Sequence, residues 1–211
     1  MFDIVIVGGG GFGREVYNWT KDSFPSNKFT IKGFLDPDKN ILNGFNMSVG
    51  VIGDEDAYEI SDRDRFIIAI GQINLKKKVI KRIKNKCGQF LTLIHPTAIV
   101  SNTTHIGEGV VICPFATVSD NVTLDDFVMM NYYSSCGHDS RVGKYSILSP
   151  YATVNGEAIL EEEVFLGSHS TVRLSKRVGR KSKVSANSAV MQDVPERALV
   201  SGVPGVAKVI Y

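Results

Sequence analysis

Between His95 and Val190 the chain reads, in successive sixes, HPTAIV, SNTTHI, GEGVVI, CPFATV, SDNVTL, DDFVMM, NYYSSC, GHDSRV, GKYSIL, SPYATV, NGEAIL, EEEVFL, GSHSTV, RLSKRV, GRKSKV and SANSAV. These sixteen hexads follow one another without an insertion, and the sixth residue of each is apolar. The fourth residue is Ala, Thr, Val or Ser in every hexad except the one that contains Lys176. A repeat held at one phase over this length indicates a stacked repeat architecture.

The spacing within each hexad identifies the kind of repeat. Residues two apart in a strand share a face, so the fourth and sixth positions face inward, one small and one large. An apolar period of six does not fit an α-helix, whose apolar period is 3.6. The sequence therefore predicts a parallel β-helix with three hexads per coil and about five coils, roughly 25 Å long. At Lys176 we expect a local bulge or an outward turn.

Composition narrows the class of protein. The chain has 211 residues and a net charge of +2, with 22% charged residues, which gives no electrostatic case for nucleic acid or a membrane surface. We expect no signal peptide, because the N-terminus has no basic n-region, and no membrane span, because no apolar run approaches eighteen residues. The three cysteines lack metal-ligand spacing. We therefore expect buried, reduced thiols in a cytoplasmic protein and no metal site.

The N-terminal part, residues 1–94, has the pattern of half a Rossmann domain. Strands are predicted over 2–7, 30–35, 66–70 and 90–94, and helices over 14–23 and 74–85. A G-x-G-x-x-G motif, at Gly8, Gly10 and Gly13, lies between the first strand and the first helix. The second strand ends at Asp36, about twenty residues past the glycines, where either a ribose hydroxyl acceptor or a turn residue is expected.

The glycine motif leaves two interpretations open, a tight turn with nothing bound or a turn whose amides hold a phosphate. A full dinucleotide-binding domain needs two mononucleotide halves, and about ninety residues suffice for one. A mononucleotide-type ligand is therefore favoured over NAD. The second domain, residues 95–211, comprises the hexads and, after Val190, an extended tail expected to pack on the solenoid.

The whole chain resembles one family, the sialic acid O-acetyltransferase-like sugar acyltransferases, and within it the bacterial nucleotide-amino-sugar N-acetyltransferases. The stretches that carry the resemblance are IVIVGGGGFGREV, GFLDPD, AIGQINLKKK, LIHPTAIVS, NYYSSCGHDSRVGKYSILSP, FLGSHSTV and SGVPGVAK. This resemblance implies a left-handed β-helix and a homotrimer with active sites between neighbouring subunits. The nucleotide sugar would lie against the N-terminal domain, and acetyl-CoA along the solenoid.

The implied reaction moves an acetyl group from acetyl-CoA to the amino group of a nucleotide-linked 4-amino-4,6-dideoxy sugar, with UDP, dTDP or GDP as the nucleotide, in bacterial surface glycan biosynthesis. The alternatives are a sugar O-acetyltransferase of the sialic acid type and a non-catalytic solenoid binding protein. An NAD-dependent enzyme is a further, weaker alternative. Saturable NAD binding by the N-terminal segment would support it.

The resemblance also implies roles for residues of this sequence. The general base falls on His138, its acidic neighbour on Asp139 and an upstream asparagine on Asn131. The positions for the nucleotide sugar are Gly10, Gly11, Phe12, Asp36, Ala69, Ile70 and Gly71. The positions for coenzyme A are Ser149, Gly156, Gly167, Ser168 and Ala186. No metal is implied.

Two departures from the family pattern bear on these roles. Some members have a second histidine nine residues after the first, where this chain has Ile147. A backbone amide or another side chain would then have to contact the thioester carbonyl. Phe12 stands in the glycine loop where other members have a polar residue, so its ring is expected to stack or pack.

Overall fold

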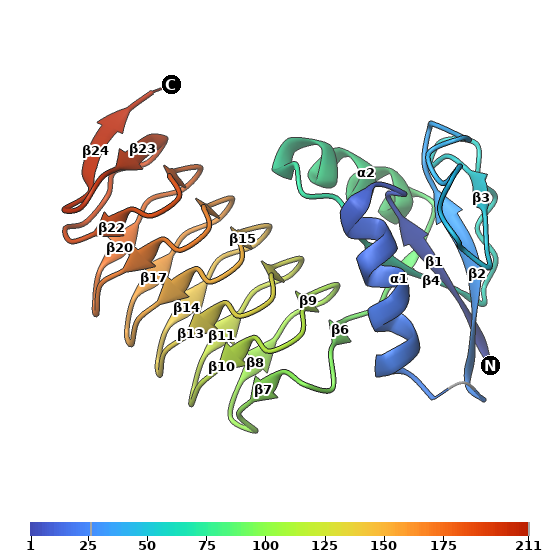
Figure 1. Cartoon of the computed structure of the whole chain (residues 1–211), viewed down its shortest axis with the longest axis horizontal. Helices are drawn as coiled ribbons and strands as arrows, with labels where there is room; N and C mark the ends of the chain where they lie inside the picture. The colour runs from blue at the N-terminus through green and yellow to red at the C-terminus, as the bar shows by residue number, and fades with distance from the viewer. Residues whose placement is uncertain (26, 211) are drawn as a thin grey trace. The chain divides into compact units, whose positions relative to one another are not determined.

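The computed structural model describes residues 1–25 and 27–210. The chain divides into two compact units, Met1–Leu93 and Ile94–Tyr211. The first is an α/β unit and the second a parallel β-solenoid, as the sequence predicts (Figure 1).

The first unit is a five-stranded parallel sheet with two helices. Its strand order is β3-β2-β1-β4-β5. The elements are β1 (Phe2–Val7), α1 (Gly11–Ser23), β2 (Phe29–Leu35), β3 (Val51–Gly53), β4 (Asp64–Ile68), α2 (Ile73–Asn85) and β5 (Gln89–Phe90). Because β2 and β4 pair with opposite edges of β1, the strand order reverses beside β1, the place where parallel α/β sheets bind ligands.

One sequence expectation for this unit was wrong, and one short strand was missed. The single strand predicted over 90–94 is two short strands in different sheets: β5 closes the first sheet, and β6 (Leu93–Ile94) begins the solenoid. The chain bends between them, at a point where the Leu91 amide still donates to the Phe66 carbonyl at 2.9 Å. The short strand β3 was not predicted. It pairs with the end of β2 over too few residues to show a period.

The solenoid is built from two-residue strands that form three sheets. The sheets run β22-β19-β16-β13-β10-β7, β20-β17-β14-β11-β8 and β24-β23-β21-β18-β15-β12-β9-β6. The remaining bounds are β7 (Ile99–Val100), β8 (His105–Ile106), β9 (Val111–Ile112), β10 (Thr117–Val118), β11 (Thr123–Leu124), β12 (Met129–Met130), β13 (Ser135–Cys136), β14 (Arg141–Val142), β15 (Ile147–Leu148), β16 (Thr153–Val154), β17 (Ile159–Leu160), β18 (Phe165–Leu166), β19 (Thr171–Val172), β20 (Arg177–Val178), β21 (Lys183–Val184), β22 (Ala189–Val190), β23 (Ala198–Ser201) and β24 (Val206–Val209).

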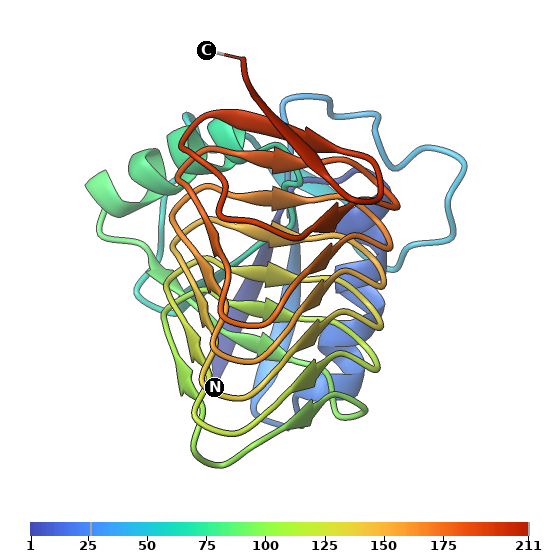
Figure 2. The ribbon, with the colours of Figure 1, turned by 90° about the vertical axis from the view of Figure 1, so that its left-hand side faces the viewer.

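Each coil contains three hexads. Strand pairs join residues 18 apart in the sequence, for example Thr117 with Ser135 and Ser135 with Thr153. Figure 2 looks at the solenoid from its C-terminal end and shows the coils lying over one another. The predicted coil length is therefore confirmed.

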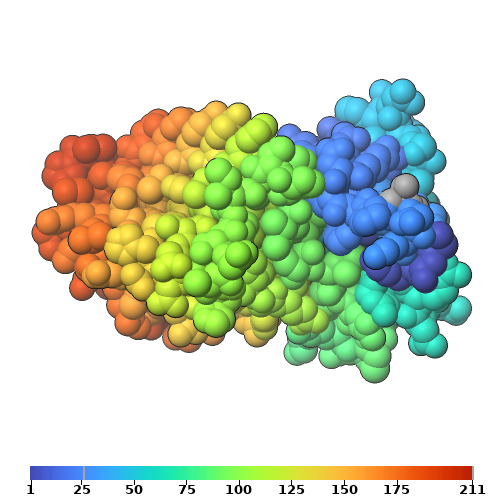
Figure 3. All heavy atoms as spheres, turned by 90° about the horizontal axis from the view of Figure 1, so that it is seen from below, coloured from blue at the N-terminus to red at the C-terminus, as the bar shows by residue number. Residues whose placement is uncertain are grey.

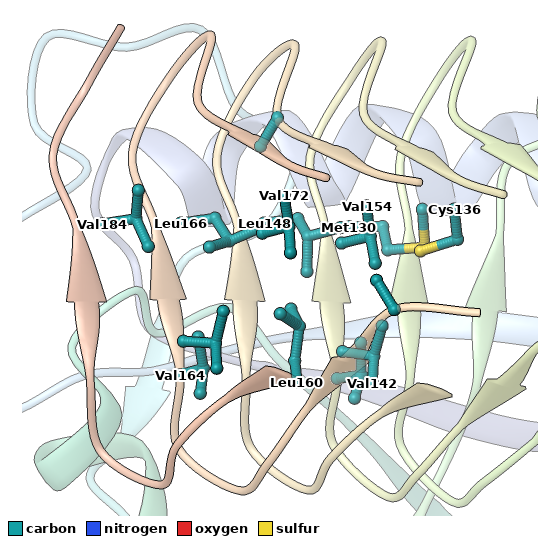
Figure 4. Close-up of a cluster of buried hydrophobic side chains, with 14 of the residues drawn as sticks. Met130, Cys136, Val142, Leu148, Val154, Leu160, Val164, Leu166, Val172 and Val184 are labelled. Carbon is teal, nitrogen blue, oxygen red and sulfur yellow. The ribbon is translucent and has the colours of Figure 1, made fainter. Parts of the chain in front are cut away.

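The inward positions are also as predicted. Residues at the sixth position are fully buried through most of the solenoid and form columns inside it, with Met130, Leu148, Leu166 and Val184 along one side (Figure 4). The fourth position is filled by buried small residues such as Ala152 and Ser146. Lys176 keeps the regular ladder, since its carbonyl accepts from the Ile159 amide at 2.9 Å, and the side chain is partly exposed. Of the two alternatives considered for Lys176, a bulge is therefore not formed.

The strands are joined by tight turns that require a left-handed residue. From Phe115 to Asn187, the third residue of every hexad has φ between 54° and 65°. The amide of the fourth residue donates to the carbonyl of the first, as Ser134 does to Asn131 at 3.1 Å. A positive φ at the third residue is the mark of a type II turn. The first three residues of each hexad thus form a corner of the coil.

The last residues pack on the solenoid, as expected, and they do so as further strands of one of its sheets. Strand β23 pairs in parallel with β21, and β24 folds back antiparallel on β23.

The face in Figure 3 shows successive coils packed against each other in chain order. Among the described residues, neither helix is long and apolar enough to cross a bilayer.

Candidate active site

His138 and Asp139 lie together on the corner between β13 and β14. Asp139 takes the left-handed turn position, with φ 59°, and the Ser140 amide closes the turn on the Gly137 carbonyl at 3.3 Å. His138 Nδ1 is 2.8 Å from Asp139 Oδ2. Their side chains are 55% and 49% exposed. Both groups therefore project outward from the coil, within reach of a molecule on its surface.

The pairing determines which imidazole nitrogen is available for chemistry. Hydrogen bonds from Asn121 and from His138 lower the pKa of Asp139, so its carboxylate is ionised at neutral pH. An ionised carboxylate can only accept hydrogen bonds. In neutral His138 the proton is therefore on Nδ1, and Nε2 carries the lone pair. This is the arrangement that a general base requires.

Asn121 also belongs to this group, although it was not predicted from the sequence. Its Nδ2 donates to Asp139 Oδ1 at 2.8 Å, from the coil before. The 18-residue coil length was the signal that could have found it, because Asn121 and Asp139 occupy the same position of successive coils.

Gly156 lies under the imidazole of His138, one coil further on. A Cβ on Gly156 would be 2.7 Å from His138 Nε2 and 2.8 Å from Cε1. Such distances are too short for non-bonded atoms, so the missing side chain leaves the space that the ring occupies. Of the five coenzyme A candidates, Gly156 is the one that lies beside His138.

If the chain has the acetyl-transfer activity that the resemblance implies, we expect Gly156→Ala to lower its kcat about tenfold or more while the melting temperature changes little, because the exposed ring can rotate away from the added methyl group. Rotation would separate Nδ1 from Asp139 and move Nε2. Steady-state kinetics beside a thermal melt measure the two effects. Unchanged kcat in a folded Gly156→Ala protein would contradict this account of the ring position.

The other solenoid candidates lie at a different corner, between the sheet of β12 and the sheet of β13. We call it the aromatic corner, residues 113–115, 131–133, 149–151, 167–169 and 185–187. It contains Asn131, Ser149, Gly167, Ser168 and Ala186. Strand β13 lies between Asn131 and His138, so one chain holds these two residues at opposite ends of one side of a coil.

The aromatic corner has a ladder of stacked rings from four coils. The ring centroids of Phe115 and Tyr133 are 5.0 Å apart, those of Tyr133 and Tyr151 4.9 Å, and those of Tyr151 and His169 4.6 Å. Tyr133 and Tyr151 are 47% and 44% exposed. Stacking between coils gives these bulky residues a partner in the left-handed conformation that they otherwise rarely adopt.

The position of the family's second histidine has no polar group. Ile147 is 2% exposed and lies in β15, paired with Met129 and Phe165 on either side. Burial raises the pKa of the Cys136 thiol, in β13 inside the coil, to about 12, which keeps it protonated. Cys113 is buried as well, whereas Cys87 is exposed, contrary to expectation. No group of three metal-ligating side chains occurs within residues 1–25 and 27–210.

The nucleotide candidates gather at the carboxyl ends of β1, β2 and β4. Helix α1 begins at Gly11 with Gly10 as its N-cap, so its first amides lie at this edge of the sheet. A Cβ on Gly8 would be 2.9 Å from the Ala69 carbonyl oxygen, which brings the glycine loop against the segment Ala69–Gly71. A Cβ on Gly13 would overlap the Gly8 carbonyl, so this glycine is needed for the helix to approach the strand.

Two candidates in this group already have partners within the chain. Asp36 accepts from the Gly9 amide at 2.8 Å and from the Asp38 amide at 3.0 Å, one bond on each carboxylate oxygen. It therefore serves as the turn residue and ties the glycine loop to the end of β2, although each oxygen can accept once more. The Phe12 ring packs edge-on against Trp19, with centroids 5.8 Å apart.

Comparison with known proteins gives a consistent picture. Residues 3–83 match the family described as the PglD N-terminal domain. GDP-perosamine N-acetyltransferase of Escherichia coli O157:H7 is 32% identical over 77 residues, 36% of this chain and 35% of the relative. UDP-N-acetylbacillosamine N-acetyltransferase of Bacillus subtilis strain 168 is 32% identical over 124 residues, 53% of this chain and 51% of the relative. The matched segments thus span about a third of the first relative and about half of the second.

A solved structure matches almost the whole chain. PerB from Caulobacter crescentus, in complex with CoA and GDP-perosamine, superposes with a TM-score of 0.88 at 26% identity, over 99% of this chain and 98% of PerB. These findings confirm the predicted fold and the resemblance to nucleotide-amino-sugar N-acetyltransferases. The acyltransferase class and the coenzyme A co-substrate expected from the sequence are those of the matched proteins.

Proposed function

We propose that this chain, which resembles nucleotide-amino-sugar N-acetyltransferases, moves an acetyl group from acetyl-CoA to the amine of a nucleotide-linked 4-amino-4,6-dideoxy sugar. The observation that carries the proposal is the His138–Asp139 pair, exposed on a solenoid corner with Nε2 directed away from its carboxylate partner. The names of the matched proteins favour an amine over a hydroxyl acceptor. A role in bacterial surface glycan synthesis, in the cytoplasm, is part of the proposal.

His138 supplies the proton transfer in the proposed reaction. The sugar amine attacks the thioester carbonyl carbon and forms the C–N bond, while Nε2 takes a proton from the amine nitrogen. The C–S bond then breaks, and the imidazolium returns the proton to the departing thiolate, which leaves as coenzyme A. Ionised Asp139 stabilises the imidazolium formed between these steps. A general base of this kind contributes about 10²- to 10⁴-fold to the rate.

The nucleotide is assigned to the first unit, at the edge where the strand order reverses. Amides at the start of helix α1 favour phosphate, and the segment Ala69–Gly71 beside Gly8 offers further backbone groups. Phe12 packs on Trp19, so we expect it to shape the loop through its apolar ring.

Coenzyme A is assigned to the aromatic corner. Ser149, Gly167 and Ala186 come from three successive coils there, and a Cβ on Gly167 would be 2.6 Å from the Ala186 amide nitrogen. This close approach of two coils leaves a strip of backbone and small side chains beside the ladder of rings, which suits an extended ligand.

A homotrimer would explain how Asn131 and His138 can act in one active site although they lie at different corners of one chain. Strand β13 keeps the two residues at different corners of one chain, so a shared active site would need Asn131 from a neighbouring copy. The proposal is therefore that each site combines His138 of one subunit with Asn131 of the next.

This arrangement predicts complementation between inactive variants. We expect His138→Ala and Asn131→Ala proteins to be nearly inactive alone and to regain about a quarter to a third of wild-type activity after joint refolding, because mixed trimers contain intact pairs. Activity in the mixture, measured by thiol release, checks this. A mixture no more active than its parts, although mass spectrometry shows mixed trimers, would contradict the shared site.

The direct test of the function is a panel of UDP-, dTDP- and GDP-linked 4-amino sugars with acetyl-CoA, followed by free thiol release. Saturable release with at least one amino sugar is expected. The matching hydroxyl sugars serve as controls. Release with hydroxyl sugars alone would indicate an O-acetyltransferase, and no release with any acceptor would favour a binding protein.

A further inference from the structure

Asn121 lies directly before Asp139 along the stack of coils. Both residues take the left-handed third position of a hexad, with φ values of 54° and 59°. Asn121 Nδ2 donates to Asp139 Oδ1 at 2.8 Å, while Asp139 Oδ2 is 2.8 Å from His138 Nδ1. The carboxylate is therefore held through both of its oxygens, one toward each neighbour.

Resting on the proposed function, we propose that Asn121 is a positioning residue that orients the Asp139 carboxylate and, through it, the imidazole of His138. Asp139 is about half exposed, so water competes for its oxygens and packing alone does not fix its rotamer. The amide of Asn121 fixes one oxygen, which leaves the other in the direction of Nδ1. The result is that Nδ1 of His138 is committed to Asp139, and Nε2 keeps its place beside Gly156.

The chemistry of position 121 requires a donor without a charge. An amide NH₂ group donates to a carboxylate, whereas an aspartate there would place a second carboxylate against Asp139 and compete for His138. Asn121 is itself held, because its backbone amide donates to Thr103 Oγ1 at 2.8 Å. The chain Thr103, Asn121, Asp139 and His138 thus forms one connected set across three successive turns of the same corner.

The same corner offers a matched control. Ser175 Oγ donates to Glu157 Oε2 at 2.7 Å, again over 18 residues and again between left-handed turn positions. This contact does not involve His138. If contacts of this kind served only to hold coils together, Asn121→Gly and Ser175→Gly would have the same consequences. Glycine is the suitable replacement, because it adopts positive φ without strain.

The kinetic test compares these variants at saturating acetyl-CoA. We expect Asn121→Gly to lower kcat about tenfold with little change in the KM for acetyl-CoA, and Ser175→Gly to leave kcat unchanged. In an Asp139→Ala background, Asn121→Gly should lower kcat by less than about twofold, since the residue acts through Asp139. An equal loss in both backgrounds, or equal effects of the two glycine variants, would overturn the proposal.

A spectroscopic readout separates this proposal from the proposed function. The ¹⁵N shifts of His138, assigned by its absence in His138→Ala, report which ring nitrogen carries the proton. Wild type and Ser175→Gly should show the Nδ1–H tautomer, and Asn121→Gly a mixture with Nε2–H. If Asn121→Gly keeps the wild-type tautomer, the positioning role is wrong whether or not the protein transfers acetyl groups. If the tautomer shifts but wild type has no activity, the proposed function alone fails.

Discussion

Replacing His138 by alanine is expected to lower kcat for acetyl transfer by about 10²- to 10⁴-fold, because the attacking amine then loses its proton only to water. The side chain is 55% exposed and lies on an outer corner of the coil, against Asp139 and Gly156, so its removal leaves the fold intact. Thiol release at saturating concentrations of both substrates measures the effect. A thermal melt of the same sample verifies folding.

His105→Ala is the matched control for this experiment. His105 is also an exposed solenoid histidine, located in β8, and it is not part of the set around Asp139. We expect its replacement to leave kcat within about twofold of wild type. Equal activity of His138→Ala and His105→Ala would exclude His138 as the base.

Val154→Asp is expected to abolish folding of the solenoid. Val154 is 0% exposed, at the sixth position of its hexad, and its strand β16 pairs with β13 on one side and β19 on the other. An aspartate there would bury an unpaired carboxylate, at a cost of more than about 4 kcal/mol in the free energy of unfolding. Soluble yield, size-exclusion chromatography and the melting temperature measure the outcome.

Thr153→Asp provides the control within the same strand. Thr153 is partly exposed and precedes Val154, so its side chain leaves the coil on the opposite face. We expect a folded protein with a small change in melting temperature. A soluble Val154→Asp variant with the melting temperature of wild type would refute the inward assignment of the sixth position.

The hexad period allowed most of the solenoid to be predicted, because a period of six in apolar residues has one compact solution and each coil repeats it. The strands at the two ends of the solenoid were harder to predict from the sequence. Residues 90–94 form an apolar run, yet the backbone divides it between two sheets. After Val190 the period ceases, while β23 still pairs with β21 through backbone groups that carry no sequence signal.

In the candidate site, too, some residues could be predicted from the sequence and others were missed. His138 and Asp139 were identified by resemblance, and the structure brings them together at 2.8 Å. Asn121 and Gly156 were not given these places, although each lies one 18-residue coil from Asp139 or His138. Counting 18 residues back from Asp139 and 18 residues forward from His138 would have identified both. The same count assigns Asn131 to another corner, because it precedes His138 by seven positions, which is not a whole coil.

The most direct test of the proposed function is mass spectrometry of the product formed by wild-type protein from acetyl-CoA and a nucleotide-linked 4-amino sugar. The proposal predicts a nucleotide sugar that is heavier by one acetyl group, with that group retained after mild alkaline treatment because an amide resists hydrolysis. An acetyl group lost on the same treatment, or an unmodified sugar across the whole panel, would contradict acetyl transfer to an amine.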